Sequence, residues 1–457
     1  MKKSIFVHDW IYHIWWAEKV FIDIIKHYIL QDIDKNDDIK WSDYIIYTLF
    51  SDKKSIKISL DNWYQTPDIK PINHDSIDSL LDDENKQAIK DENSIISDKE
   101  ELKYSDFDIE VKTTLPRWIF GVFKWFEKKQ IPFLSKIFDY RNLMFFYPIL
   151  IRWARLDIKK YNPDRVVISS FAVVKNILAT RYRQDNNINT ILYLHSPYMF
   201  LWNHFEKNRD KLNNFIWFFY NFAKKLQTNR DLKTIYTNEI KYNSFYTKSL
   251  IDKIYYGKVV VNDNKYDDNF IRYPKANQEY IDLNLDSGEI YSNEWNNSDY
   301  YIYIWRIVRF SKELENIVKL FDHNGRKLYI IWSWPDEEYL KSISWENINW
   351  LGYIWDVSEK IKYMRWARWC INLTLESFWL VNIESLLCGI PIFGLDKWWT
   401  REIVDDQEDI SYLVKKIDQD SLIKEFEIFE DSIGNNIYNP TNLRKHGLEL
   451  ISKYCNW

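Results

Sequence analysis

The stretch INLTLESFWLVNIESLLCGIPIFGLDKWWTREIV, residues 371–404, decides the fold. It predicts a buried strand, a turn, a helix, a second buried strand and a second turn. Short apolar strands that alternate with helices are typical of parallel α/β sheets. The two turns contain Trp379 and the pair Trp398–Trp399, at places where glycine is usual because it reaches positive φ without steric cost.

Glycine is scarce along the whole chain, and tryptophan is abundant. The 457 residues include 23 Trp and 9 Gly, whereas an ordinary usage of about 7% predicts roughly 32 glycines. Many tryptophans lie in strand-to-helix loops, as in HIWWAEKV, IWSWPDEE and DKWWTRE. UGA codons encode Trp in one variant genetic code and Gly in another, so we hypothesise that many of these Trp are glycines in the living protein. The alternative is a protein rich in genuine tryptophan, whose indoles stack on bases or sugars.

Composition narrows the classes of function and the cellular compartment. A chain of 457 residues with 46% hydrophobic residues is long enough for two domains. The net charge of −5, from 62 basic and 67 acidic residues, gives no case for a nucleic-acid partner. The three cysteines show neither a disulfide framework nor metal-ligand spacing, which favours the cytoplasm. No segment has the ~20 uninterrupted apolar residues of a membrane-spanning helix.

The alternation of strand and helix occurs in two series. The first begins at KSIFVHD and continues through RVVISSFAVVKNI and NTILYLHSP, and the second runs from YYIYIWRIVRF to the opening stretch. The polar stretch 277–299 between them predicts an interdomain linker. We therefore expect an N-terminal domain over 1–276, a C-terminal domain over 300–435 and a helix over 436–457 that packs back on the N-terminal domain. Residues 73–108, with 12 acidic and 4 basic side chains, predict a surface insertion or mobile loop.

Two glutamates of the opening stretch are candidate ligand-binding residues. Glu376 ends the predicted strand, and Glu384 lies one to two turns into the following helix. The strand-to-helix turn places both carboxylates beside one ligand at the carboxyl end of the sheet, where open α/β folds bind ligands. Carboxylates accept hydrogen bonds from the hydroxyls of sugars and ribose. Two unrelated surface glutamates are the alternative.

The residues ESFWLVNIESLLCGIPIF, with glycine at Trp379, resemble the signature E-[S/G]-F-G-L-x-x-x-E-A-x-x-x-G-x-P-V of retaining glycosyltransferases of family 4. HDWIYHIWWAEKV, YIWRIVRFSKELENIV and IIWSWPDEEYL are similar to other motifs of that family, and YLHSPYMFLWNHF resembles its O-antigen mannosyltransferase-like branch. These motifs are spread over most of the chain. Several of them need glycine where Trp is printed, which independently supports the decoding hypothesis.

The resemblance implies a GT-B fold, in which two Rossmann-like doubly wound parallel-sheet domains face a cleft. It implies transfer of a hexose, mannose in the branch that the chain resembles, from a nucleotide-diphosphate sugar to a glycan or lipid-linked acceptor. The transfer would retain configuration and serve the synthesis of cell-surface polysaccharide. No metal or other cofactor is implied, because positive groups of the protein offset the charge that develops on the leaving diphosphate.

The resemblance also implies roles for individual residues. His195 would lie beneath the sugar near the acceptor, Glu376 would hold the donor sugar, and Glu384 would hold the ribose hydroxyls. A buried structural histidine is the alternative for His195. Met199 and Asn203 stand where the branch usually has Arg and Asp, which affects the contacts expected on the acceptor side.

Arg306 and Lys312 would supply positive charge beside the diphosphate, and solvated charges at a helix start are the alternative for each. The backbone N–H groups at residues 15–16 open a helix and would add its dipole if both residues are glycines. The donor-binding set implied by the resemblance is completed by Trp15, Trp16, Phe378, Trp379 and Leu380.

Residues 112–160 carry 11 basic and 3 acidic side chains, interleaved with Phe, Trp, Tyr and Leu. This composition predicts peripheral docking on the anionic inner face of the plasma membrane, near a lipid-linked acceptor. Ordinary helices that cover the N-terminal sheet are the alternative.

Two other functions stay open at this point. A nucleotide-sugar 2-epimerase has the same fold, although the E-x7-E helix and the GGAEKV-like loop favour a transferase. If the Trp residues are literal, indoles would obstruct the phosphate loop and the chain would be an inactive homologue. UGA codons at positions 379, 398 and 399, beside UGG at 10 and 202, would favour the decoding hypothesis.

Overall fold

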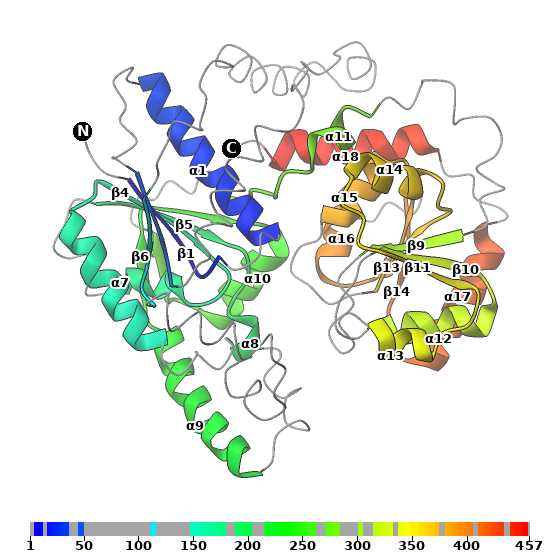
Figure 1. The fold of residues 1–457 in the computed structure, drawn as a ribbon, viewed down its shortest axis with the longest axis horizontal. Coiled ribbons are helices and arrows are strands. Elements are labelled where there is room, and N and C mark those ends of the chain that lie inside the picture. Colours follow the sequence, from blue (N-terminus) through cyan, green and yellow to red (C-terminus); the bar gives the residue numbers. More distant parts are fainter. Residues whose placement is uncertain are drawn as a thin grey trace. The chain divides into compact units, whose positions relative to one another are not determined.

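The computed structural model describes residues 4–11, 16–35, 44–49, 110–115, 147–179, 188–202, 214–261, 270–283, 300–304, 314–331, 337–373, 380–404, 410–433 and 439–455 (Figure 1). These residues fall into two compact units that divide between Arg272 and Tyr273. We call the part up to Arg272 the N-terminal unit and the part from Tyr273 onward the C-terminal unit.

The N-terminal unit is built on a parallel sheet in the order β3-β2-β1-β4-β5-β7. Its strands are β1 (Ser4–His8), β2 (Tyr44–Thr48), β3 (Glu110–Thr113), β4 (Arg165–Ser170), β5 (Asn189–Leu194) and β7 (Glu239–Tyr242). The chain moves outward from β1 to β3 and resumes at β4 on the other side of β1. The topological switch point, where doubly wound sheets bind ligands, therefore lies between β1 and β4.

Helices and one short sheet accompany the six strands of this unit. The helices are α1 (Trp16–Lys35), α7 (Tyr147–Tyr161), the 3₁₀ helix η4 (Val174–Leu178), α8 (Met199–Trp202), α9 (Asn214–Asp231) and α10 (Phe245–Ile254), and the short sheet pairs β6 (Ile235–Thr237) with β8 (Val259–Val261). Helix α1 repeats apolar residues at helical spacing and buries Val20, Ile24 and Tyr28 in one cluster with Phe6 and Ile46 of the sheet. This burial holds α1 on the sheet.

The C-terminal unit repeats the same topology, with strands in the order β11-β10-β9-β12-β13-β14. These are β9 (Tyr300–Ile304), β10 (Lys327–Ile331), β11 (Ile348–Gly352), β12 (Cys370–Asn372), β13 (Ile392–Leu395) and β14 (Ser411–Val414). The helices are α11 (Gln278–Ile281), α12 (Leu314–Asn324), α13 (Glu337–Ser342), α14 (Val357–Arg365), α15 (Leu380–Leu387), α16 (Trp398–Val404), α17 (Gln419–Ile433) and α18 (Pro440–Tyr454). The switch point of this sheet lies between β9 and β12.

Helix α15 packs closely against α18. Gly389 ends the turn after α15 with φ +75°, and a Cβ there would lie 2.9 Å from the Cβ of Pro440. A Cβ on Gly447 of α18 would lie 3.2 Å from the Cβ of Leu386. Both glycines therefore permit the close approach of the two helices. The buried Arg444 strengthens it by donating hydrogen bonds to backbone carbonyls of α11 and α15.

Two doubly wound, parallel α/β units confirm the predicted fold class. The predicted domain limits, the return of 436–457 to the N-terminal domain and the cleft stay predictions. Helix α11, with its buried Tyr280, lies within the predicted linker 277–299. The segment 73–108 lies outside the described residues, as does most of 112–160. None of the helices in the described ranges has the length and apolar character needed to cross a membrane.

The second predicted turn differs from the structure. Trp398 and Trp399 are the first residues of helix α16. The Trp399 side chain is buried, and its ring lies edge-on to Tyr273 at a centroid distance of 4.7 Å. An indole at this position therefore packs as a core side chain.

Candidate functional site

A group of buried polar side chains lies at the switch point of the N-terminal unit. His8 ends β1, Ser169 is the penultimate residue of β4, and His195 directly follows β5. The parallel register pairs His8 with Ser169, and β4 pairs in turn with β5. Because the carboxyl ends of parallel strands share one edge of the sheet, three distant segments bring these side chains together.

The hydroxyl of Ser169 connects the two imidazoles. His8 Nδ1 lies 3.0 Å from the carbonyl oxygen of Ser169 and 3.1 Å from its Oγ. The same Oγ lies 2.7 Å from Nε2 of His195. The His8 ring also stacks on Phe21 of α1, at a centroid distance of 4.7 Å. All three polar side chains are completely buried.

Both histidines are neutral near pH 7. Burial lowers the pKa of His8 to about 3, against the opposite effect of its hydrogen bond to the Ser169 carbonyl. Burial and the neighbouring His8 hold the pKa of His195 well below its usual value. Neutral imidazoles form hydrogen bonds but carry no charge to attract phosphate. This edge of the sheet is therefore suited to hydroxyl groups.

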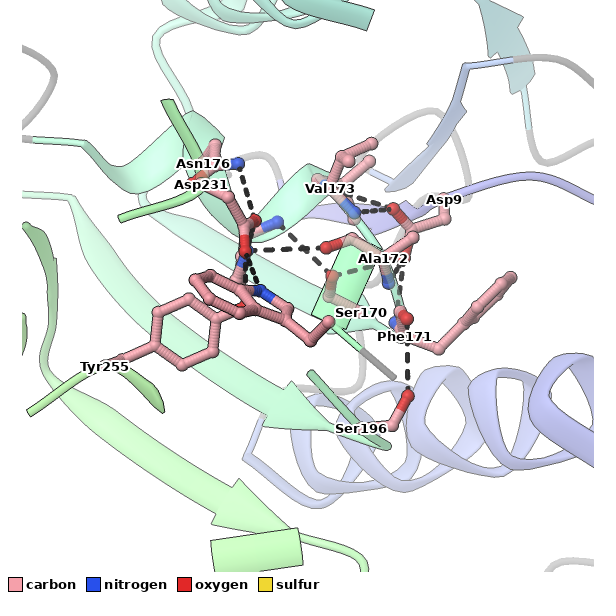
Figure 2. Close-up of polar contacts among 12 residues, drawn as sticks. Asp9, Ser170, Phe171, Ala172, Val173, Asn176, Ser196, Asp231 and Tyr255 are labelled. Carbon is pink, nitrogen blue, oxygen red and sulfur yellow. Dashed lines mark hydrogen bonds and ion pairs between the residues drawn. The ribbon is translucent and has the colours of Figure 1, made fainter. Parts of the chain in front are cut away.

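Asp9 occupies the place where an anion would bind at this edge. Figure 2 shows its carboxylate facing the start of η4, where both oxygens accept hydrogen bonds from the backbone N–H groups of residues 171–174 at 2.6–2.9 Å. The hydroxyl of Ser170 donates to the same carboxylate at 3.1 Å. Burial raises the pKa of Asp9, while these backbone hydrogen bonds act in the opposite direction. Since both oxygens face N–H donors, the arrangement fits the ionised form and leaves no room for a phosphate.

A second buried carboxylate fixes the segment that follows His195. Asp231, at the end of α9, forms an ion pair with Lys175, and both side chains are almost fully buried. It also accepts hydrogen bonds from the indole N–H of Trp202 at 2.8 Å and from the Tyr255 hydroxyl at 2.5 Å (Figure 2). Asp231 thereby ties α8, η4 and the end of α10 together. The contact uses the indole nitrogen of Trp202, so this Trp has a specific structural role.

In the C-terminal unit, Glu384 lies on α15, the helix that follows switch-point strand β12. Its side chain is only 7% exposed, and its Oε2 lies 3.5 Å from Nζ of Lys360 on α14. Burial and the charge of Glu384 raise the pKa of Tyr280 well above its usual value. The Lys360 ammonium also lies 5.2 Å from the centre of the Tyr280 ring. Glu384 is thus a buried carboxylate with a cation beside it.

A ladder of buried polar side chains positions the helices after β12 and β13. Asn372 of β12 donates to the side-chain oxygen of Asn382 at 2.5 Å, and Asn382 donates to the Thr400 hydroxyl at 3.4 Å. Gly394 of β13 allows α16 to approach, because a Cβ there would lie 2.7 Å from the methyl group of Thr400. These contacts fix the starts of α15 and α16 at the edge where β12 and β13 end.

The structure describes four of the predicted site residues. His195 belongs to the N-terminal group and Glu384 to the C-terminal unit, while Trp16 and Leu380 begin α1 and α15. The other predicted residues lie outside the described ranges: Glu376, Trp15, Arg306, Lys312, Phe378 and Trp379. In sequence, however, 305–313 directly follow β9, and 374–379 follow β12 after one intervening residue. These are the two strands at the switch point.

Sequence reasoning missed His8 and Ser169 as members of the group around His195. A signal was present, since His8 follows the apolar run IFV and Ser169 follows VVI. Polar residues that end buried parallel strands gather at one edge of the sheet.

In the ranges that the structure describes, no cluster of three or more His, Cys, Asp or Glu side chains is placed to hold a metal ion. The expectation that the protein uses no metal stays a prediction.

The chain was compared with known proteins at the level of sequence families, curated proteins and solved structures. No family model and no curated protein matches it. Sucrose-phosphate synthase from Thermosynechococcus elongatus is similar in structure with a TM-score of 0.54 and 12% identity, over 100% of this chain and 96% of that chain. A glycosyltransferase from Rickettsia africae has a TM-score of 0.50 and 11% identity, over 100% and 95%. Anabaena HepE in complex with UDP has a TM-score of 0.48 and 12% identity, over 98% of this chain and 94% of that chain.

At this level of identity the likeness shows the fold alone. Together with the two repeated sheets, it shows that the chain has the GT-B fold.

Proposed function

We propose that the protein is a retaining glycosyltransferase of family 4, which moves a hexose from a nucleotide-diphosphate sugar to a glycan or lipid-linked acceptor. We expect mannose as the sugar and cell-surface polysaccharide as the product. The observation that carries the proposal is the buried carboxylate of Glu384, on the helix that follows switch-point strand β12 of a GT-B fold. The glycosyltransferase motif predicts a donor-binding glutamate at this position.

Glu384 is suited to bind the ribose of the donor. A carboxylate has about four hydrogen-bond acceptor positions, of which Lys360 contacts one and the Tyr280 hydroxyl uses another. The remaining positions can accept hydrogen bonds from two neighbouring hydroxyls. We propose that Arg306 and Lys312, in the stretch that follows β9, offset the charge of the diphosphate, and that Glu376 contacts the transferred sugar.

Further donor contacts come from the remaining residues of the family motifs. We propose that Phe378, Trp379 and Leu380 lie along the donor, and that the backbone at Trp15 and Trp16 faces its phosphates. No cofactor is needed for this chemistry.

The N-terminal unit is suited to bind an uncharged part of the substrates. His195 is neutral and buried, and Asp9 already occupies the run of N–H groups that an anion would use. A sugar hydroxyl fits this environment better than a phosphate does. We therefore propose that His195 contacts a hydroxyl of the transferred sugar, next to the donor bond that breaks.

A peripheral membrane contact forms a further part of the proposal. Helix α7 exposes Ile149, Trp153 and Leu156 by 48%, 50% and 57%, at spacings that place them along one stripe. Arg152 and Lys160 are exposed beside this stripe, as is Asp157, whose carboxylate accepts a hydrogen bond from the Tyr47 hydroxyl at 2.9 Å. An apolar stripe flanked by cations is suited to the surface of an anionic bilayer. The opposite face of α7 is buried, so the helix also covers its own unit.

We also propose that many, but not all, of the Trp residues are glycines in the living protein. Trp345 and Trp355, in the loops on either side of β11, are 72% and 85% exposed, so glycine would remove little buried surface there, although Trp355 meets the ring of Tyr353 edge-on at 4.3 Å. Trp10 differs, because its ring lies edge-on to Phe171 at 4.6 Å. Trp202 also differs, since it donates to Asp231. These two are the Trp residues that we expect to be genuine.

The proposed function is tested by a donor screen on protein whose UGA-encoded positions are restored to glycine. Thermal unfolding is followed with a panel of nucleoside diphosphates and nucleotide sugars. A ligand that binds the native state raises the melting temperature, so we expect one nucleotide-sugar class to do so, and Glu384→Gln to reduce the shift. A panel without any stabilising nucleotide would contradict the proposal, as would an unchanged shift in the variant.

A further inference from the structure

We propose that Ser169 and His8 are positioning residues, which determine the ring nitrogen of His195 that carries the proton. The hydrogen-bonded chain runs from His8 through the Ser169 hydroxyl to His195. The consequence for catalysis rests on the proposed function, whereas the proton positions follow from the geometry of the three residues alone.

The proton position of His8 follows from a backbone carbonyl. The carbonyl oxygen of Ser169 can only accept a hydrogen bond, and it lies 3.0 Å from Nδ1 of His8. Nδ1 of His8 therefore carries the hydrogen. The opposite tautomer would lose this bond and place the hydrogen on Nε2, which is buried with no hydrogen-bond partner in the described part of the chain.

The Ser169 hydroxyl then determines the proton position of His195. Its oxygen lies 3.1 Å from Nδ1 of His8 and 2.7 Å from Nε2 of His195. If His195 Nε2 also carried a hydrogen, Oγ would face two N–H groups, and its own hydrogen would have no acceptor among the described contacts of Ser169. Burying such a hydrogen without a partner is costly. The hydroxyl hydrogen therefore points to His195 Nε2.

The neutral His195 ring then carries its only N–H on Nδ1. Aromatic neighbours fix the orientation of both imidazole rings for these hydrogen bonds. His8 stacks on Phe21, and Tyr193 meets His195 edge-on at a centroid distance of 4.8 Å. In this form Nε2 is engaged by Ser169, and Nδ1 can donate a hydrogen bond but cannot take a proton. His195 would thus act on a substrate oxygen that reaches its buried Nδ1 as a neutral hydrogen-bond donor, and not as a general base.

Nitrogen NMR of the full chain, labelled with ¹⁵N-histidine, tests the proton positions. Long-range proton–nitrogen spectra distinguish a protonated ring nitrogen from a bare one, and His8→Asn and His195→Asn identify the two spin systems. We expect Nδ1–H for both histidines in the unmodified protein. Ser169→Ala should give His195 a detectable Nε2–H population, while Ser169→Thr should keep Nδ1–H because it retains the hydroxyl.

Ser196→Ala is the matched control, since this neighbouring hydroxyl donates to the Phe171 carbonyl at 3.3 Å and not to a histidine. It should leave the His195 spectrum unchanged. An Nε2–H form of His195 in the unmodified protein would overturn the inference without any variant. The inference also fails if Ser169→Ala leaves His195 entirely in the Nδ1–H form.

Transfer kinetics test the catalytic consequence separately. Ser169→Ala should lower kcat about 10- to 100-fold, less than the loss of a donor that contacts the transition state, with the KM for the donor nearly unchanged. Ser169→Thr should restore most of kcat. Equal kcat for Ser169→Ala and the unmodified protein would overturn the positioning role. If the NMR spectra are as expected but the protein turns over no nucleotide sugar, the hydrogen bonds from His8 through Ser169 to His195 stand. That result would contradict the proposed function and not the proton positions.

Discussion

Replacing Asp9 by Asn tests the interpretation of the N-terminal switch point. The carboxylate accepts four backbone hydrogen bonds through two oxygens, two at each oxygen. The amide of Asn keeps one oxygen and turns an NH₂ group toward the other pair of N–H groups. Two buried N–H groups then lose their acceptor, at about 1–3 kcal/mol each. The free energy of unfolding should therefore fall by about 2–6 kcal/mol.

Thermal and urea unfolding of the full chain, followed by circular dichroism, measure this change. At about 2–4 °C per kcal/mol for a domain of this size, the transition of the N-terminal unit should shift down by about 4–24 °C. Ser170→Ala is the control, because it removes one donor to Asp9 and the long 3.4 Å contact from the Lys175 N–H, but leaves the four backbone N–H groups at the Asp9 carboxylate paired. Its cost should stay below about 1.5 kcal/mol. A change of less than about 1 kcal/mol in the Asn variant would refute the interpretation of Asp9 as the filled anion site.

The remaining predictions concern substrates and membrane. Arg306→Ala and Lys312→Ala should each weaken nucleoside diphosphate binding by about 1.5–3 kcal/mol, as for a lost charge-assisted hydrogen bond; calorimetry showing unchanged affinity in both would remove them from the donor site. Glu384→Gln should raise the donor KM while Glu376→Gln mainly lowers kcat, and equal effects on KM alone would contradict this division. Trp153→Ser should reduce sedimentation with anionic liposomes and leave donor turnover in solution unchanged; undiminished sedimentation would exclude the exposed stripe of α7.

The fold class was predictable because each buried strand is a short apolar run between helices. The two series of such runs in the sequence became two sheets of identical strand order. The repeated order itself was not visible in sequence, since it depends on which strands pair.

The group around His195 was only partly predictable. His195 was identified through a motif, but His8 and Ser169 belong to it only because β4 lies between β1 and β5. In the same way, Lys175 and Asp231 are 56 positions apart and meet through packing. Apolar periodicity identifies strands and helices, but it does not pair charges across them.

Trp398 and Trp399 differ most from the prediction of tryptophan in turns, because both begin helix α16. In the described part of the chain, Asn162 is the only residue other than glycine with positive φ. Positive φ therefore gives no reason for glycine at any described Trp, and the decoding hypothesis depends on the family motifs and on loops outside the described ranges. Trp10 and Trp202, by contrast, make a ring contact with Phe171 and an N–H contact with Asp231 that glycine could not make.

Donor turnover by two versions of the chain, measured side by side, tests the decoding hypothesis and the proposed function together. One version keeps every printed Trp, and the other restores glycine in the loops HIWWAEKV, IWSWPDEE, SFWL and DKWW while keeping Trp10 and Trp202. Both are incubated with nucleotide-diphosphate sugars and glycan acceptors, and the released nucleotide and the anomeric configuration of the product are determined. We expect the glycine-restored version to transfer the sugar with retention of configuration. We expect no transfer by the version that keeps every Trp. Equal activity of the two versions would contradict the decoding hypothesis, and no transfer by the glycine version with any donor would contradict the proposed function.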